Sequence, residues 1–354
     1  MSRVTFKKSY HAYTRKKMIF IAACCILTFA LLCVSLSIGK YELSVTESYR
    51  IFINILFGRN KVVTMADEVV WEMRLPRSMM AVSVGAGLSV AGAAMQSLLK
   101  NPLADPYTTG VSSGASFGAS IAIVYGFCLL PSITGQNAII VNAFLLSLIP
   151  SAVMVALNIF KKNTTATTTI LTGIAIMYVF SAMTAMIKLL AKPESLSEVY
   201  IWSVGTLGKA TWDNIGVVTT VVISGSALLM LVSRHLNVST SGDKLAATLG
   251  ININALRVYL LVVISFMTSA IVSFTGTIGF VGLAVPHMVR RIIGSENRYL
   301  LPASMAFGAV FLLLCDIIAR SVGTTGLPVG TITALFGGPL FIYLLIKENK
   351  LLKG

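Results

Sequence analysis

Residues 106–160 read PYTTGVSSGASFGASIAIVYGFCLLPSITGQNAIIVNAFLLSLIPSAVMVALNIF and contain no Asp, Glu, Lys or Arg. About a quarter of the residues of a soluble domain are charged, so a stretch of this length cannot belong to an ordinary soluble surface. It is long enough for two helices that each cross a bilayer in about 20 apolar residues. The stretch therefore predicts an integral membrane protein.

The rest of the chain has the same character, because 56% of its 354 residues are hydrophobic and 12% are charged. Backbone groups in lipid must be hydrogen bonded within the protein, which favours an all-α architecture. Gly276, Gly279 and Gly282 interrupt the uncharged stretch 258–289, and we interpret that stretch as two segments joined by a tight turn. We expect about ten transmembrane helices, at 18–39, 79–99, 107–130, 138–160, 166–187, 214–233, 256–274, 278–289, 299–319 and 328–346.

The net charge of +15 indicates orientation rather than nucleic-acid binding, because it is unevenly divided between the two sides of the membrane. Ten spans place both termini on one side, and the segments on that side carry 18 of the 28 Lys and Arg residues. The positive-inside rule then predicts cytoplasmic termini. The expected organisation is a basic cytoplasmic tail at 1–17, a membrane domain at 18–346 with a cytoplasmic connection at 234–257, and a cytoplasmic tail at 347–354. On the opposite side, 196–207 is predicted to form a short amphipathic helix with Trp202 and Trp212 at interface depth.

Catalysis by this chain is not expected. The sequence has no phosphate-binding GxxxxGK[ST] loop, no HExxH pair and no CxxC pair, so we predict neither a bound cofactor nor a metal site. An ion-driven carrier normally has several titratable groups within its spans. The clear candidate is Asp316, and Arg320 four residues later predicts a local ion pair. An ion-driven carrier remains an alternative.

The cytoplasmic connection contains a segment of about two helical turns that is bracketed by glycines. It is either a solvated loop or a docking element for a partner. Its residues are Gly242, Asp243, Lys244, Leu245, Ala246, Ala247, Thr248, Leu249 and Gly250.

An ordered set of strings resembles one family, the FecCD-type permease subunits of type II ATP-binding-cassette (ABC) importers for iron-siderophores, haem and cobalamin. The strings are RLPR at 74–77, NPLADP at 101–106, the bracketed segment 242–250, GTIGFVGLAVPHMVR at 276–290, DIIAR at 316–320 and LPVGTITALFGGP at 327–339.

The resemblance implies the type II ABC importer permease fold in the cell membrane of a prokaryote. It implies that residues 242–250 couple to a cytoplasmic ATPase, and that Arg74, Arg77 and Arg320 receive acidic residues of an extracytoplasmic binding protein. For Arg320 the alternative is a purely structural pairing with Asp316.

The resemblance also implies a translocation path between two permease subunits, identical or paralogous, with an inner gate at 163–169. That segment contains Thr164, Thr165 and Thr167, which either line the path or cap a helix start. Two ATPase subunits, rather than this chain, are expected to use ATP and Mg²⁺. The cargo is not identified by the sequence, because specificity is expected to reside mostly in the binding protein.

Overall fold

The computed structural model describes residues 3–39, 41–58, 64–160, 166–322 and 326–351, and within these ranges the regular structure is helical throughout. The elements are α1 (Arg3–Ser37), α2 (Val45–Leu56), α3 (Met65–Glu68), η1 (Val69–Arg74), α4 (Leu75–Leu99), η2 (Pro106–Thr109), α5 (Val111–Tyr125), α6 (Gly135–Phe160), α7 (Ala166–Leu190), α8 (Pro193–Val204), α9 (Trp212–Leu231), α10 (Ser233–Thr240), α11 (Asp243–Thr248), α12 (Ile253–Thr275), α13 (Val281–Ile293), α14 (Asn297–Ser321) and α15 (Val329–Leu351).

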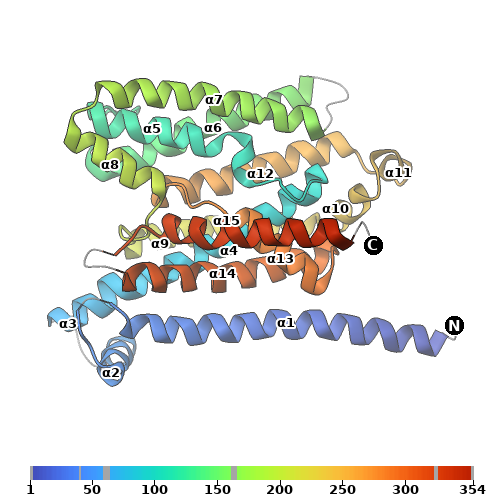
Figure 1. Cartoon of the computed structure of the whole chain (residues 1–354), viewed down its shortest axis with the longest axis horizontal. Coiled ribbons are helices and arrows are strands. Elements are labelled where there is room, and N and C mark those ends of the chain that lie inside the picture. Colours follow the sequence, from blue (N-terminus) through green and yellow to red (C-terminus); the bar gives the residue numbers. More distant parts are fainter. Residues whose placement is uncertain (1–2, 40, 59–63, 161–165, 323–325, 352–354) are drawn as a thin grey trace.

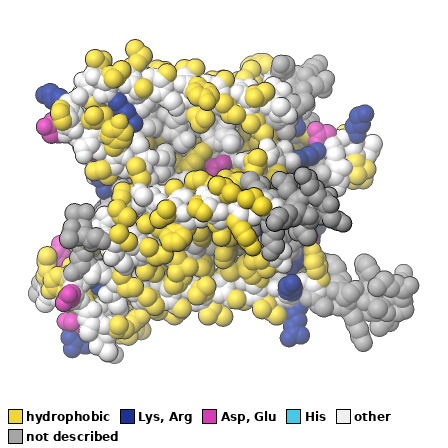
Figure 2. Space-filling view, viewed as in Figure 1, with side chains coloured by type: hydrophobic (Ala, Val, Ile, Leu, Met, Phe, Trp, Pro, Cys, Tyr) yellow, Lys and Arg dark blue, Asp and Glu magenta, His cyan; other side chains and the backbone are white. Residues whose placement is uncertain are grey.

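The all-helical membrane fold is confirmed, because seven described helices are long and apolar enough to cross a bilayer. The helices α5 and α13, together with α15, account for the remaining three predicted spans. Both chain termini lie at one end of the bundle together with α10 and α11, which we call the termini end (Figure 1). Helices α2, α3 and α8 lie at the opposite end, which we call the far end. The face of the bundle seen in Figure 2 is largely covered by hydrophobic side chains between these two ends, as a lipid-facing surface requires.

Helix α1 begins much earlier than the predicted span at 18–39. It is continuous from Arg3, so most of the residues expected to form a basic tail are the first turns of the same helix, and these project beyond the other helices (Figure 1). Arg and Lys are good helix formers, and nothing in this segment stops the helix. Lys17 also fixes it to the bundle: its Nζ lies 2.7 Å from Glu296 Oε2 and 4.5 Å from the centre of the Tyr299 ring.

The predicted break between residues 258 and 289 is confirmed, with α12 and α13 separated by residues 276–280. Helix α13 begins against the middle of α4, because Gly282 contacts Gly92. The non-helical backbone before it is partly satisfied by Tyr107, whose hydroxyl donates to the carbonyl oxygen of Ile278 at 3.1 Å. Irregular backbone at this depth requires such partners because lipid offers none.

Other helix boundaries shift where a glycine adopts a left-handed conformation. Helix α5 spans residues 111–125 rather than 107–130, because Gly126 has φ 65° and ends it. Helix α8 spans residues 193–204 rather than 196–207, because Gly205 has φ 81°. Trp202 is buried, and the Trp212 indole donates to the backbone oxygen of Trp71 at 3.1 Å. Both tryptophans therefore pack against other residues at the far end of the bundle.

Helix α4 forms the centre of the bundle and packs against α14, α13, α12 and α9. Its small residues let neighbouring backbones approach closely. A β-carbon at Gly85 would lie 2.3 Å from the carbonyl oxygen of Gly308, and one at Gly92 would lie 1.8 Å from that of Gly282. No side chain fits in these two places, so glycine sets the spacing between α4 and its neighbours.

We expect Gly92→Ala to destabilise the protein by roughly 1–3 kcal/mol, because the new methyl group must displace the backbone of α13. The measurement is the midpoint of thermal unfolding in detergent. The matched control is Gly216→Ala in α9, where a β-carbon meets no atom within 4 Å. Equal midpoints for the two variants would show that the contact between Gly92 and Gly282 does not limit stability.

Candidate functional site

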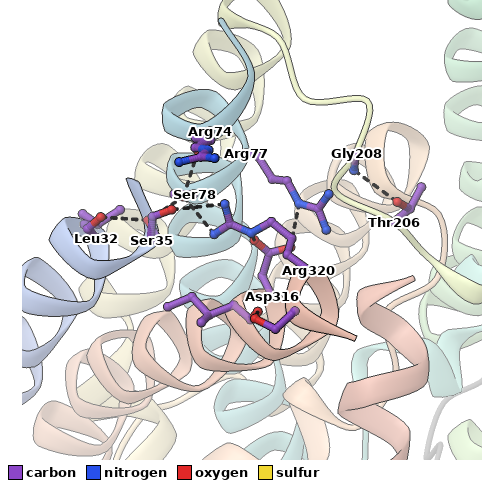
Figure 3. Close-up of polar contacts among 11 residues, drawn as sticks. Leu32, Ser35, Arg74, Arg77, Ser78, Thr206, Gly208, Asp316 and Arg320 are labelled. Atoms are coloured by element: carbon purple, nitrogen blue, oxygen red, sulfur yellow. Dashed lines mark hydrogen bonds and ion pairs between the residues drawn. The ribbon is translucent and has the colours of Figure 1, made fainter. Parts of the chain in front are cut away.

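Three arginines predicted from the sequence come together at the far end. Arg74 ends η1, Arg77 lies in the first turn of α4, and Arg320 lies in the last turn of α14 (Figure 3). They line one cavity of about 760 Å³. The remaining wall is mostly apolar and is formed by Ile38, Gly39, Tyr41, Met65, Val69, Met73, Ile201, Thr206, Gly208, Gly326, Leu327 and Pro328.

Asp316 lies between two of these arginines and is fully buried. Its Oδ1 accepts a hydrogen bond from Arg77 Nε at 2.8 Å. Its Oδ2 lies 3.0 Å from Arg320 Nε, in an orientation that makes an ion pair but not a hydrogen bond. The predicted pair within α14 is therefore confirmed. The pair with Arg77 was missed because 239 residues separate the partners. Arg320 is the only charged residue within four positions of Asp316, so the sequence contains no signal for the second pair.

Arg74 and Arg320 hold the end of α1 in place. Arg74 Nη1 donates to the backbone oxygen of Leu36 at 2.7 Å, and its Nη2 donates to that of Tyr41. Arg320 Nη1 donates to the backbone oxygen of Ser35 at 3.3 Å. The last carbonyls of a helix have no partner within the helix and carry partial negative charge, so guanidinium groups stabilise them.

The three arginines consequently differ in accessibility. The Arg77 side chain is 21% exposed, whereas the Arg320 side chain is 8% exposed and Arg74 is buried. The resemblance implied one docking role for all three arginines, and the structure shows that they differ in how far they reach solvent. Sequence reasoning could not separate them, because the carbonyl groups of α1 that bind Arg74 and Arg320 become neighbours only on folding.

The second candidate site is α11 at the termini end, within the predicted docking segment. Gly242 and Gly250 have φ of 129° and 80°, so they turn the chain into and out of the helix. Ala246 is fully buried and fixes one face of the helix to the bundle. Leu245 and Leu249 are four residues apart and are 50% and 62% exposed. Residues at this spacing share a helix face, so α11 presents two apolar side chains outward.

Asp243 connects α11 to two spanning helices. Its Oδ1 lies 2.7 Å from Nζ of Lys100, the residue that follows α4. Its Oδ2 lies 3.6 Å from Nη2 of Arg257, which is in the first turn of α12. Asp105, in the same connection as Lys100, has another role: it caps η2 by accepting from the backbone N–H of Tyr107 at 2.8 Å, and burial raises the pKa of its carboxyl group to about 6.

The predicted threonine gate is described only in part. Thr164 and Thr165 lie outside the described residues. Thr167 is exposed near the start of α7, and Thr169 is buried one half-turn later. Among the residues that the structure describes, no cluster of three or more His, Cys, Asp or Glu side chains could hold a metal ion.

Comparison with known proteins agrees with this architecture. The cobalamin import system permease protein of Halobacterium salinarum is 40% identical over 280 residues, which cover 79% of this chain and 74% of that protein. The hemin transport system permease protein of Yersinia pestis is 36% identical over 292 residues, covering 81% and 87%. A solved metal-chelate type ABC transporter in an inward-facing conformation has a TM-score of 0.80 and 30% identity, covering 92% of this chain and 98% of that chain.

The family model named FecCD transport family matches residues 27–347, which is nearly the whole chain. Together with the helices long enough to cross a bilayer, this match describes a multi-pass membrane permease of the ABC transporter type. The chain belongs to the FecCD transport family.

Proposed function

We propose that this chain pairs with a second permease subunit, either another copy or a paralogue, to form the path of an ATP-driven importer. Two cytoplasmic ATPase subunits bind at the termini end and use ATP and Mg²⁺, while this chain hydrolyses no ATP. An extracytoplasmic binding protein delivers the cargo to the far end. The relatives named above import cobalamin and hemin, and we propose a cargo of that class or an iron-siderophore.

The geometry of α11 is the observation that carries this proposal. A water-facing helix rarely exposes two leucines on one side unless they are covered by a partner. The helix is anchored to the bundle by Ala246 and Asp243. A force applied to Leu245 or Leu249 is therefore transmitted to α4 and α12. This arrangement suits a coupling element that receives a conformational change from an ATPase.

The charge distribution supports a cytoplasmic termini end in a prokaryotic cell membrane. Lys and Arg residues are concentrated in the segments at that end, which the positive-inside rule assigns to the cytoplasm. An ATPase supplied with cytoplasmic ATP must bind there, and α11 lies at the same end (Figure 1). The distribution of Lys and Arg and the position of α11 therefore support the same orientation.

The arginine cavity supports docking at the far end. Arg77 is partly exposed within a mostly apolar wall, and a guanidinium group binds a carboxylate strongly when water is excluded around it. Arg74 and Arg320 lie in the same cavity and contribute positive charge, while their hydrogen bonds hold α1. For the path, we keep the proposal that Thr164, Thr165 and Thr167 form part of an inner gate.

We expect the double substitution Lys244→Asp, Leu245→Asp to weaken the complex with the cognate ATPase at least tenfold. Two carboxylates would have to be buried where an apolar and a basic side chain docked. The measurement is the affinity of purified permease for the ATPase. Arg298→Glu, a charge change at the same end outside α11, is the control and should leave the affinity unchanged. A double variant that binds normally and supports uptake would contradict the coupling role.

We expect Arg77→Glu to weaken docking of the cognate binding protein at least tenfold at low salt, because an acidic partner would meet a like charge. The difference from wild type should shrink as salt is added, since mobile ions screen accessible charges. Arg50→Glu, in an exposed position of α2, is the control at the same end. Affinity for Arg77→Glu that matches wild type at low salt would place docking elsewhere.

We expect the permease alone in liposomes to hydrolyse no ATP and to import no cargo under a proton or sodium gradient. Adding the ATPase and binding protein should give ATP-dependent uptake. The measurement is accumulation of radiolabelled cobalamin, hemin or ferric siderophore, with empty liposomes as the control. Gradient-driven uptake without the ATPase would favour the alternative of an ion-driven secondary transporter.

A further inference from the structure

The three arginines of the far-end cavity have unequal freedom to bind a ligand. Arg74 donates through both terminal nitrogens to backbone oxygens of Leu36 and Tyr41. Arg320 donates from Nη1 to the backbone oxygen of Ser35 and from Nη2 to Ser78 Oγ at 3.4 Å, while its Nε faces Asp316. These two guanidinium groups are occupied within the chain.

Arg77 is different, because only its Nε is engaged. Within the described part of the chain, its two terminal nitrogens make no hydrogen bond or ion pair, and they lie at the cavity wall. Nη1 is close to Gly208, 3.8 Å from the position that a β-carbon would occupy. The absence of a side chain at Gly208 leaves the end of this guanidinium group open to the cavity.

The position of Asp316 determines which edge of Arg77 is open. A guanidinium group offers two edges to a carboxylate: one formed by Nε and Nη, and one formed by the two terminal nitrogens. Asp316 occupies Nε and is buried, so it cannot leave for solvent without losing two ionic partners. The remaining edge faces the cavity and matches a second carboxylate with two parallel hydrogen bonds.

We propose that Asp316 is a positioning residue, which holds the docking arginine Arg77 with its terminal nitrogens toward the far-end cavity. The occupant is a carboxylate of the extracytoplasmic binding protein, so this inference rests on the function proposed above. The cavity contains three guanidinium groups, and two of them pair with the single carboxylate of Asp316. The cavity wall therefore carries a net positive charge. The buried carboxylate reduces the attraction for an acidic partner but fixes the geometry of its receptor.

These two effects of Asp316 predict opposite results for its removal. If Asp316 acted only through its charge, Asp316→Asn would strengthen docking of an acidic partner, because a negative charge leaves a positive cavity. If Asp316 positions Arg77, Asp316→Asn weakens docking, because the amide keeps one acceptor oxygen and turns an NH₂ donor toward one of the two guanidinium groups. We expect at least fivefold weaker docking, measured as binding of the cognate binding protein to the assembled permease–ATPase complex at low salt.

A double-mutant cycle separates positioning from a general structural effect. Arg77→Lys keeps the charge but lacks Nε and the planar edge, and we expect at least fivefold weaker docking from it alone. In that background, Asp316→Asn should no longer weaken docking, because no guanidinium group remains at residue 77 to be oriented and only the loss of a negative charge is felt. Tighter docking by Asp316→Asn alone, or the same loss in both backgrounds, would overturn the proposal.

Two further outcomes keep the test decisive. If Asp316→Asn fails to yield a monodisperse complex, Arg77→Lys still decides, since wild-type docking by this variant would overturn a role for the planar edge. Failure of the underlying docking site has a different signature: Arg77→Glu would then also leave docking unchanged. Weakened docking by Arg77→Glu with normal docking by both Arg77→Lys and Asp316→Asn would reject this inference alone.

Discussion

The close approach of backbones around α4 is the constraint on which the rest of the structure depends. Gly85 and Gly92 bring α14 and α13 so near that a methyl group cannot be inserted. With spacing fixed in this way, the first turn of α4 places Arg77 beside Asp316 of α14. The residue that follows the other end of α4, Lys100, contacts Asp243 of α11. One buried helix thus positions both candidate sites, at opposite ends of the bundle.

The sequence was sufficient for features that depend on local composition. Uncharged stretches predicted the spans, and glycines predicted the break before α13 and the boundaries of α11. Features that depend on contacts between distant segments were not predictable in this way. The pairing of Arg77 with Asp316 and the contact of Asp243 with Lys100 arise only when α4 meets α14 and α11. The start of α1 was missed because hydropathy marks where lipid ends, whereas the helix continues into the basic segment.

The functions of the arginines at the far end follow from what each guanidinium group can reach. The C-terminal carbonyls of α1 need donors, and Arg74 and Arg320 supply them. A motif match assigns one role to all three arginines, since it compares residue types and positions. Among the described residues, the hydrogen bonds divide them into two that hold a helix end and one, Arg77, whose terminal nitrogens have no partner. Which arginine can bind a partner at this end therefore depends on the hydrogen bonds formed in the folded protein, and residue type alone does not determine it.

The source of energy for transport can be argued from the scarcity of titratable groups. Two buried acidic side chains lie within the candidate spans that the structure describes: Asp67, which accepts from the backbone N–H of Thr64 at the start of α3, and Asp316 of α14. The Asp316 carboxylate is paired with the guanidinium groups of Arg77 and Arg320. A proton-driven carrier needs exchangeable groups along its path. The family match and the ABC permease relatives instead agree with energy supplied by partner subunits, and the exposed leucines of α11 are where we propose that it enters.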